Sequence, residues 1–264
     1  MTTDFGGGSH YVAAMKGAIL GIHPEVTIVD LTHEVWPQDV RSAAWILAAT
    51  AGEFPPGTIH VAVVDPGVGT ERAIVVAEID GQRFVAPDNG LLGLVATRGQ
   101  VERLHRVTQP QYWRGDVSAT FHGRDVMGPV AAHLSLGVDV ASLGPAHDGL
   151  VALGWTQPHC AGRSISGEIV FVDTFGNLIS NIDRGTLAAV PRDAVPTVTC
   201  GEAADIDFVT TYADRKRYAG RGSSVRAVTS KWRSWAAMPA VRWTPAWARR
   251  LPCAGDLPCA GEPA

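Results

Sequence analysis

The sequence predicts an α/β fold, in which an N-terminal layered domain with a largely parallel sheet precedes a small C-terminal β domain. Strand-like and helix-like segments alternate over residues 1–155, a pattern typical of a sheet covered by helices. Two segments, residues 27–30 and 59–65, are continuous β-branched runs, which suit strands buried on both faces. After a Pro-, Gly- and His-rich linker at 154–162, short paired strands indicate a partial β domain over residues 160–214.

Local patterns justify the remaining elements in turn. A helix over residues 11–22 has one apolar face, formed by Val12, Met15, Ile19 and Ile22. The dipeptide Asp80-Gly81 is a hairpin turn signal between two strands. The same reasoning predicts helices over residues 40–51 and 124–136, strands over 73–79 and 83–86, and short strands over 166–182 and 197–211.

Composition narrows the class of protein. The chain has 264 residues, 46% of them apolar, and a net charge of -4, which gives no general attraction to nucleic acid or to an anionic membrane. It contains no apolar run long enough for a membrane span and no signal peptide pattern. The four cysteines form no CxxC pair, so we expect reduced thiols and a cytoplasmic location.

Ligands of such sheets lie beyond the carboxyl ends of strands, and three acids, Asp4, Asp30 and Asp65, stand near predicted strand ends. Asp4 belongs to a glycine-rich loop, TDFGGG, that could approach a ligand closely or could be only flexible. Asp65 opens the turn DPGVGTER, which could fold Arg72 back onto the carboxylate. The plainer alternative is that Asp65 caps the turn while Arg72 forms a surface ion pair.

Two further motifs carry side chains with suitable chemistry. His122, in FHGRD before a helix, could orient or deprotonate water, or could be structural. In the turn DTFGN, Phe175 offers a face for stacking a base and Asn177 a donor and an acceptor for a purine edge, unless this is an ordinary turn. The histidines show no metal-ligand spacing, so we expect no metal.

These motifs occur together and in order, and the chain resembles the S-adenosyl-L-methionine (SAM) hydroxide adenosyltransferases, or SAM hydrolases, which are relatives of fluorinase and chlorinase. The resemblance covers roughly residues 1–214. It rests on TDFG at 3–6, YVAAMKG at 11–17, IVDLTHEVWPQDVRSAAWIL at 28–47, HVAVVDPGVGTER at 60–72, FVAPDNGLL at 84–92, FHGRDVMGPVAAHL at 121–134 and VDTFGNLISNI at 172–182.

The resemblance implies cleavage of SAM by water at the ribose C5′, giving adenosine and methionine, with no cofactor. It implies a homotrimer whose active sites lie between one subunit's N-terminal domain and its neighbour's C-terminal domain. By motif position the catalytic set is Asp65, Arg72 and His122, and Asp4 binds the ribose hydroxyls. Phe175 and Asn177 contact the adenine, and Asp173 lies on the methionine side.

The chemistry of this set is coherent. The neutral thioether is an excellent leaving group, so the protein need only hold a water in line with the C5′–S⁺ bond. Asp65 and His122 can accept hydrogen bonds from that water and take its proton, while Arg72 stabilises the charge. Halide transfer is the first alternative, although Asp65 would repel an anion in a dry site. A protein that binds SAM or adenosine without catalysis is the second, and it need not keep all three residues.

The two ends of the chain differ from the family pattern. Family members have a strand just before the TDFG motif, so we expect that strand to be truncated or missing here. Residues 215–264 are rich in Arg, Trp, Ala and Pro without a period and end in a repeated LPCAG. This composition predicts an atypical tail, either frameshifted in the gene or disordered.

Overall fold

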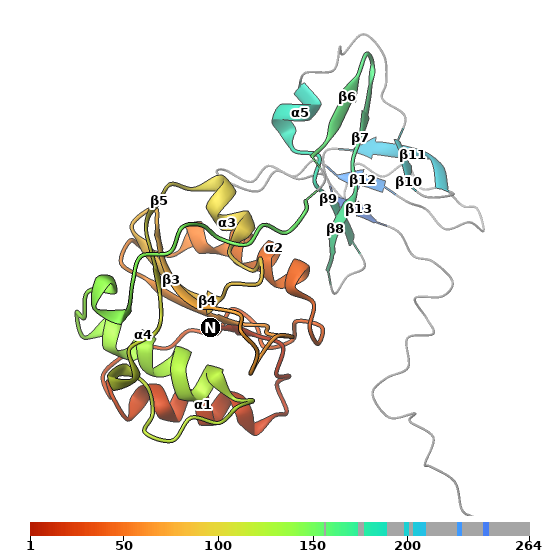
Figure 1. Cartoon of the computed structure of the whole chain (residues 1–264). Helices are drawn as coiled ribbons and strands as arrows, with labels where there is room; N and C mark the ends of the chain where they lie inside the picture. Colours follow the sequence, from red (N-terminus) through yellow and green to blue (C-terminus); the bar gives the residue numbers. More distant parts are fainter. Residues whose placement is uncertain are drawn as a thin grey trace, which may run out of the picture. The chain divides into compact units, whose positions relative to one another are not determined.

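The computed structural model describes residues 1–155, 157–173, 177–188, 198–200, 203–209, 226–228 and 240–242. The chain divides into two compact units, Met1–Trp155 and Thr156–Ala264 (Figure 1). No helix in the described ranges is long and apolar enough to cross a bilayer.

The first unit is built on a five-stranded mixed sheet with strand order β1-β2-β4-β3-β5. Strands β1, β2 and β4 pair in parallel, and β3 runs antiparallel to both β4 and β5. Four strands therefore point the same way and β3 alone is reversed, which confirms the predicted α/β class. The elements are β1 (Thr2–Thr3), α1 (His10–Leu20), α2 (Val40–Thr50), β2 (Ile59–Val63), β3 (Ile74–Ile79), β4 (Gln82–Pro87), α3 (Gly93–Arg98), β5 (Val101–Arg106), the π-helix η3 (Gly123–Met127) and α4 (Gly128–Ser135), with short 3₁₀ turns at Ala51–Glu53, Pro110–Tyr112 and Val140–Leu143.

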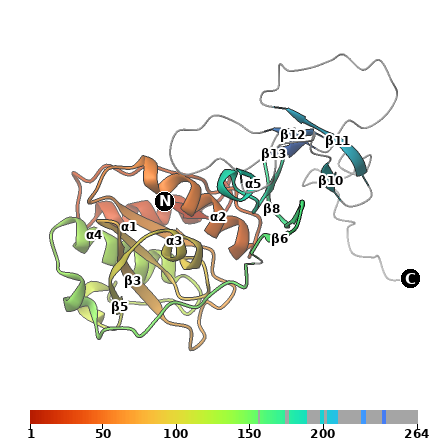
Figure 2. The ribbon, with the colours of Figure 1, turned by 90° about the horizontal axis from the view of Figure 1, so that it is seen from above.

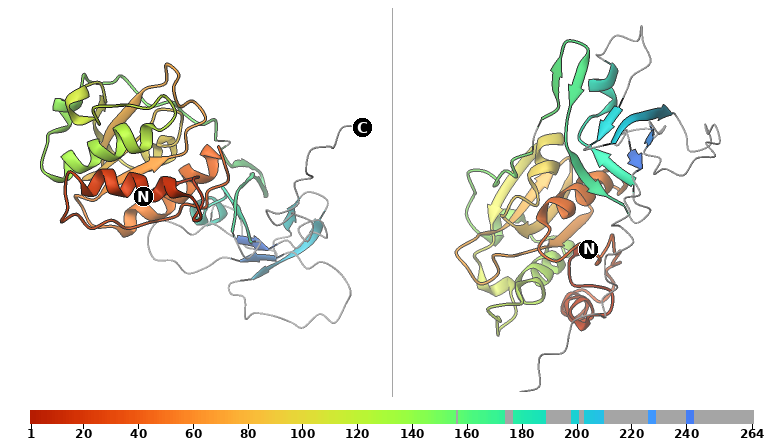
Figure 3. Two further views of the ribbon diagram at one scale, coloured as in Figure 1. Left: turned by 90° about the horizontal axis from the view of Figure 1, so that it is seen from below. Right: turned by 90° about the vertical axis from the view of Figure 1, so that its right-hand side faces the viewer.

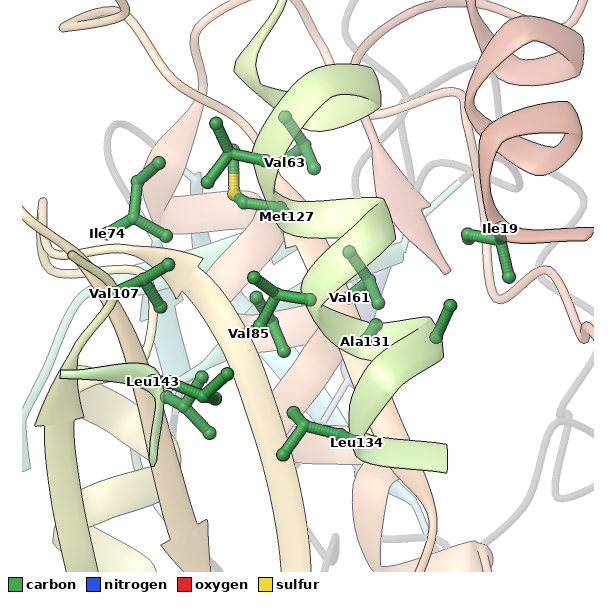
Figure 4. Close-up of a cluster of buried hydrophobic side chains, with 14 of the residues drawn as sticks. Ile19, Val61, Val63, Ile74, Val85, Val107, Met127, Ala131, Leu134 and Leu143 are labelled. Carbon is green, nitrogen blue, oxygen red and sulfur yellow. The ribbon is translucent and has the colours of Figure 1, made fainter. Parts of the chain in front are cut away.

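Helices cover both faces of this sheet (Figures 1 and 2). Alternation along each strand sends Val61 and Val63 of β2 to a core shared with α1 and α4, whereas Ala62 and Val64 face α2 and α3. Figure 3 shows α1 and α4 lying side by side, and Figure 4 shows Met127 among the valines of the first core. The continuous apolar run of β2 is thus explained by burial on both faces.

Turn and cap residues end these elements where their chemistry requires it. Asp80 and Gly81 both have positive φ, 50° and 71°, as the two-residue hairpin between β3 and β4 demands. Ser9 caps α1 by accepting from the backbone N–H of Tyr11, and Asp39 caps α2 by accepting from that of Ser42. The glycine-rich loop before α1 directly follows β1 and therefore lies at the carboxyl edge of the sheet.

Some predicted elements differ from the structure. The strand predicted over residues 27–30 is wrong: these residues form no ladder, and pairing with β1 is limited to the single bridge Thr2–Thr32 just after them, because β1 spans only two residues. The helix predicted over 124–136 is a π-helix followed by α4. Helix α3 and strand β5 had no clear sequence pattern, because α3 is short and β5 is largely exposed.

The second unit is rich in β structure, as predicted. Its main sheet has the order β10-β11-β12-β13-β9-β8, and β6 and β7 form a separate hairpin. One strand of that hairpin falls within the predicted linker, and β12 and β13 fall within the stretch predicted as an atypical tail. The elements are β6 (His159–Ala161), β7 (Ser164–Ser166), β8 (Ile169–Val172), β9 (Asn177–Ser180), α5 (Arg184–Ala188), β10 (Val198–Cys200), β11 (Ala203–Val209), β12 (Arg226–Val228) and β13 (Ala240–Arg242).

Candidate active site

Asp65 and Arg72 form a buried ion pair just beyond the carboxyl end of β2. Arg72 Nε donates to Asp65 Oδ1 at 3.0 Å and to Oδ2 at 2.9 Å, and Nη2 donates to Oδ2 at 2.5 Å. The side chains are only 5% and 10% exposed, respectively. Charge-assisted bonds of this kind are strong because little water competes with them.

The loop between these residues is folded by its own backbone. Val68 N–H donates to the carbonyl of Asp65, and the backbone N–H and hydroxyl of Thr70 both donate to the carbonyl of Gly67. Gly69 has φ 79°, and a β-carbon there would lie 2.7 Å from the carbonyl oxygen of Ala119. Only glycine allows this turn to bring Arg72 back to Asp65 while packing against the loop that precedes His122.

Arg72 also reaches His122, which is 50 residues further along the chain. Its Nη2 lies 2.8 Å from His122 Nδ1. Because a guanidinium can only donate, Nδ1 must be the acceptor, and in the neutral ring the proton then resides on Nε2. The three residues of the predicted catalytic set therefore form one connected cluster, in which His122 presents Nε2–H as a donor.

The environment favours a neutral imidazole. Burial lowers the pKa of His122 below its usual value, and the positive charge of Arg72 lowers it further, against smaller opposing effects of Asp65 and Asp125. His122 directly precedes η3, and π-helical turns recur at functional sites. The position of His122 directly before η3 and its bond to Arg72 thus hold the ring in one tautomer.

Aromatic packing joins the Asp4 loop to the His122 loop. Phe5 meets Phe121 edge-on at 5.9 Å between ring centroids, and Tyr11 contacts both rings. Because Phe5 follows Asp4 and Phe121 precedes His122, these contacts fix the two loops against each other. Asp4 itself accepts a 2.8 Å bond from the backbone N–H of Gln38, a residue with φ 65°. A carboxylate has about four lone-pair sites, so Asp4 keeps capacity for further donors.

The other predicted site residues lie in the second unit. Asp173 and Asn177 bond to each other: Oδ1 of Asp173 accepts from the backbone N–H of Asn177 at 2.8 Å, and Oδ2 from its amide at 2.5 Å. Asn177 is buried, and one of its amide hydrogens is already used inside this turn. Phe175 lies outside the described residues.

The sequence patterns assigned no role to three further polar residues of the first unit, Asp88, Asn89 and Asp125. Asn89, which follows β4, donates from Nδ2 to the carbonyl of Val64 at 2.9 Å and so steadies the backbone before Asp65. Asp88 accepts from the backbone N–H of Val151 and pairs with His147 at 2.9 Å. Asp125 is a fully buried carboxylate three residues after His122. All three stand in motifs noted above. The partners of Asp88 and Asn89 are distant in sequence, so only a strand-end signal pointed to these two residues.

No group of three or more His, Cys, Asp or Glu side chains in the described part of the chain is arranged to hold a metal ion.

The fold and this cluster define a class of protein. The chain belongs to the SAM hydroxide adenosyltransferase family: the model of the family's N-terminal domain matches residues 1–144, and that of its C-terminal domain matches residues 167–225.

Individual relatives agree with this placement. The chain is 42% identical over 196 residues to an (R)-S-adenosyl-L-methionine hydrolase of Salinispora arenicola, covering 72% of this chain and 74% of the relative. A fluorinase of Actinoplanes is 30% identical over 212 residues, covering 70% and 71%. A crystal structure of an uncharacterized conserved protein from Thermotoga maritima superposes with a TM-score of 0.81 at 33% identity, covering 91% and 90%.

Proposed function

We propose that this protein hydrolyses SAM at the ribose C5′, giving adenosine and L-methionine. The observation that carries the proposal is the partly buried cluster of Asp65, Arg72 and His122 at the carboxyl edge of the sheet. Family membership and the hydrolase relatives support the same reaction.

The reaction balances with SAM and water alone. The water oxygen forms a bond to C5′ as the C5′–S⁺ bond breaks, and the bonding pair leaves on sulfur to give the neutral thioether of methionine. One water proton passes to the Asp65 carboxylate and then to solvent, and the oxygen becomes the 5′-hydroxyl of adenosine. Because the leaving group needs no activation, we propose no metal or redox cofactor.

We assign different roles to Asp65 and His122. Asp65 is the proton acceptor, since its two oxygens keep one lone-pair site after three bonds from Arg72. His122, with Nδ1 occupied by Arg72, donates from Nε2 to the water oxygen and stabilises its developing hydroxide character. This differs from the expectation that both side chains accept from the water.

The remaining residues bind the substrate in this proposal. Asp4 accepts hydrogen bonds from the ribose hydroxyls with the acceptor capacity left by Gln38. Phe175 and Asn177 meet the adenine, and Asp173, through its bonds to Asn177, shapes that turn on the methionine side.

We extend the proposal to assembly and location. The first unit is the catalytic α/β domain and the second the β domain, and a homotrimer completes each active site with a neighbouring subunit. Cys160 and Cys200 are free thiols, which is consistent with a cytoplasmic protein. The net charge of -4 favours neither nucleic acid nor membrane as a partner.

The function is tested by incubating the purified protein with SAM, with and without chloride, and separating the products by chromatography. Adenosine and methionine in equal amounts, independent of chloride, are expected. A chlorinated nucleoside would instead identify a halogenase, and intact SAM with measurable binding would identify a binding protein. Since the hydrolase relatives are named for the (R) epimer, both sulfonium epimers are supplied separately, and faster turnover of the (R) epimer is expected.

A further inference from the structure

Asp125, three residues after His122, lies at the centre of a second charged cluster. Its carboxylate is fully buried, and it accepts from Arg124 Nε at 2.6 Å and Nη2 at 2.8 Å. Arg114 Nη1 lies 3.5 Å from the same carboxylate. A buried carboxylate without partners is costly, so these two guanidinium groups are what allow Asp125 to stay charged in the core.

The same residue ties the loop before His122 to the helix after it. The Asp125 side chain accepts a 2.9 Å bond from the backbone N–H of Ser118. Its own backbone N–H donates to the carbonyl of Phe121, and its carbonyl accepts from Arg114 N–H at 2.9 Å. Arg114, Ser118 and Phe121 thus all bond to this one residue, Ser118 to its side chain and the other two to its backbone.

This loop touches both sides of the catalytic cluster. Ala119 packs against Gly69 in the turn that returns Arg72 to Asp65, and Phe121 packs against Phe5 beside Asp4. Arg124, held by Asp125, stacks over the ring of Phe121 at 4.7 Å. Displacement of the loop would therefore move His122 relative to Arg72.

We propose that Asp125 is a positioning residue for the hydrolysis reaction, which holds the loop that presents the His122 ring to Arg72 and supplies a compensating negative charge beside that ring. The proposal rests on the function proposed above. Misplacing a reacting group by about 1 Å can cost about 10²-fold in rate, so an anchor of this kind matters even though it touches no substrate.

The electrostatic part of the role has a definite sign. The charged groups that act on His122 are Arg72, Asp65 and Asp125, and only the two carboxylates favour its protonated form. Around Asp125 stand Arg124 and Arg114, with Asp116 also acting on Arg124. Removing the charge of Asp125 should lower the pKa of His122. Arg124 offsets part of the Asp125 charge through their ion pair, so removing the charge of Arg124 should raise the pKa of His122.

The test is an NMR titration of the His122 ring in protein without SAM, with the resonance assigned by its loss in His122→Gln. Asp125→Asn, which preserves shape, should lower the pKa of His122, and Arg124→Gln should raise it. Asp125→Asn should also reduce kcat about tenfold with KM for SAM within about threefold. The control is Asp139→Asn, which removes a more exposed carboxylate paired with Arg103 and should change neither the pKa nor kcat.

The outcomes separate this proposal from the function itself. Absence of adenosine in the wild-type reaction would overturn the proposed function, while the titration would still test Asp125. Equal pKa values in the wild type and both variants, or shifts of the same sign, would overturn the positioning role. If Asp125→Asn does not fold, the direction of the shift in Arg124→Gln decides the question alone.

Discussion

The two ends of strand β2 use polar groups in opposite ways. At its amino end, His60 is buried, stacks on Phe84 at 4.7 Å between ring centroids and donates from Nε2 to Gln82 Oε1 at 3.2 Å. Gln82 in turn donates to the carbonyls of Ala51 and Phe54. Beyond the carboxyl end, Asp65, Arg72 and His122 form a charged cluster.

The comparison shows that a lowered histidine pKa does not by itself identify a site. Burial is the largest cause for both rings, and it lowers the pKa of His60 to about 4. The difference lies in the second partner: a neutral amide for His60, but a cation for His122. A neutral, closed network contributes stability, whereas an ion pair that leaves one imidazole N–H available can contribute catalysis.

The largest effect expected at the carboxyl end is on turnover. Asp65→Asn should lower kcat by about 10³-fold, because the amide cannot take the proton of the attacking water. SAM affinity should stay within a few fold. The measurement is adenosine release against SAM concentration. The matched control is Asp88→Asn, at the same edge of the sheet but paired with His147, which should stay near wild type. A large loss of affinity with unchanged turnover would contradict the role of Asp65.

At the amino end the expected effect is on stability instead. Unfolded His60 binds a proton near pH 6.5 and the folded ring only near 4, so the unfolded state holds more protons between these values. The free energy of unfolding is therefore at its full value above pH 6.5 and decreases as the pH falls. The loss reaches about 3 kcal/mol at pH 4.

Denaturant unfolding at several pH values checks this, with His60→Gln as the comparison. The variant should lose less stability between pH 6.5 and pH 4 than the wild type, and its turnover at pH 7 should remain near normal. Parallel stability curves for the two proteins would show that His60 titrates normally.

A smaller effect should separate binding from turnover within the carboxyl edge. Asp4→Ala should raise the dissociation constant for SAM about 30-fold, equivalent to about 2 kcal/mol for lost charge-assisted bonds. Its turnover at saturation should change little. Asp4→Asn, which can still accept from Gln38, controls for that backbone contact. Unchanged SAM affinity in Asp4→Ala would remove Asp4 from the ribose site.

Two substitutions at position 122, of which the milder should have the smallest effect, test the tautomer of His122. Glutamine can donate near the position of Nε2, so His122→Gln should keep kcat within about tenfold of wild type, whereas His122→Ala should lose about 10²-fold. A proton on Nδ1 removes the acceptor for Arg72 and so releases the ring from its position. Wild-type kcat/KM should therefore fall as pH decreases through the lowered pKa of His122, and His122→Gln should lack that fall. Equal inactivity of both variants would favour a base at position 122.

Sequence patterns were sufficient where the cause of structure is local. The apolar run of β2, the Asp80-Gly81 turn and the face of α1 with Met15 and Ile19 all appear as predicted. Sequence patterns did not predict elements whose structure depends on contacts with another segment of the chain. Residues 27–30 have strand-like side chains but lack a long enough neighbour. The helix pattern of residues 124–136 also gave no sign of the π-helix η3, where Gly128 N–H bonds to the carbonyl of Gly123.

The sequence by itself determined the family, the α/β class and the identity of the groups that can react, because motif residues and strand and helix periodicity are written locally. Only the tertiary structure decided which nitrogen of His122 accepts from Arg72 and what holds the loop behind it. Arg72 and His122 lie 50 residues apart, and the geometry of their contact is set by how three loops pack at one edge of a sheet.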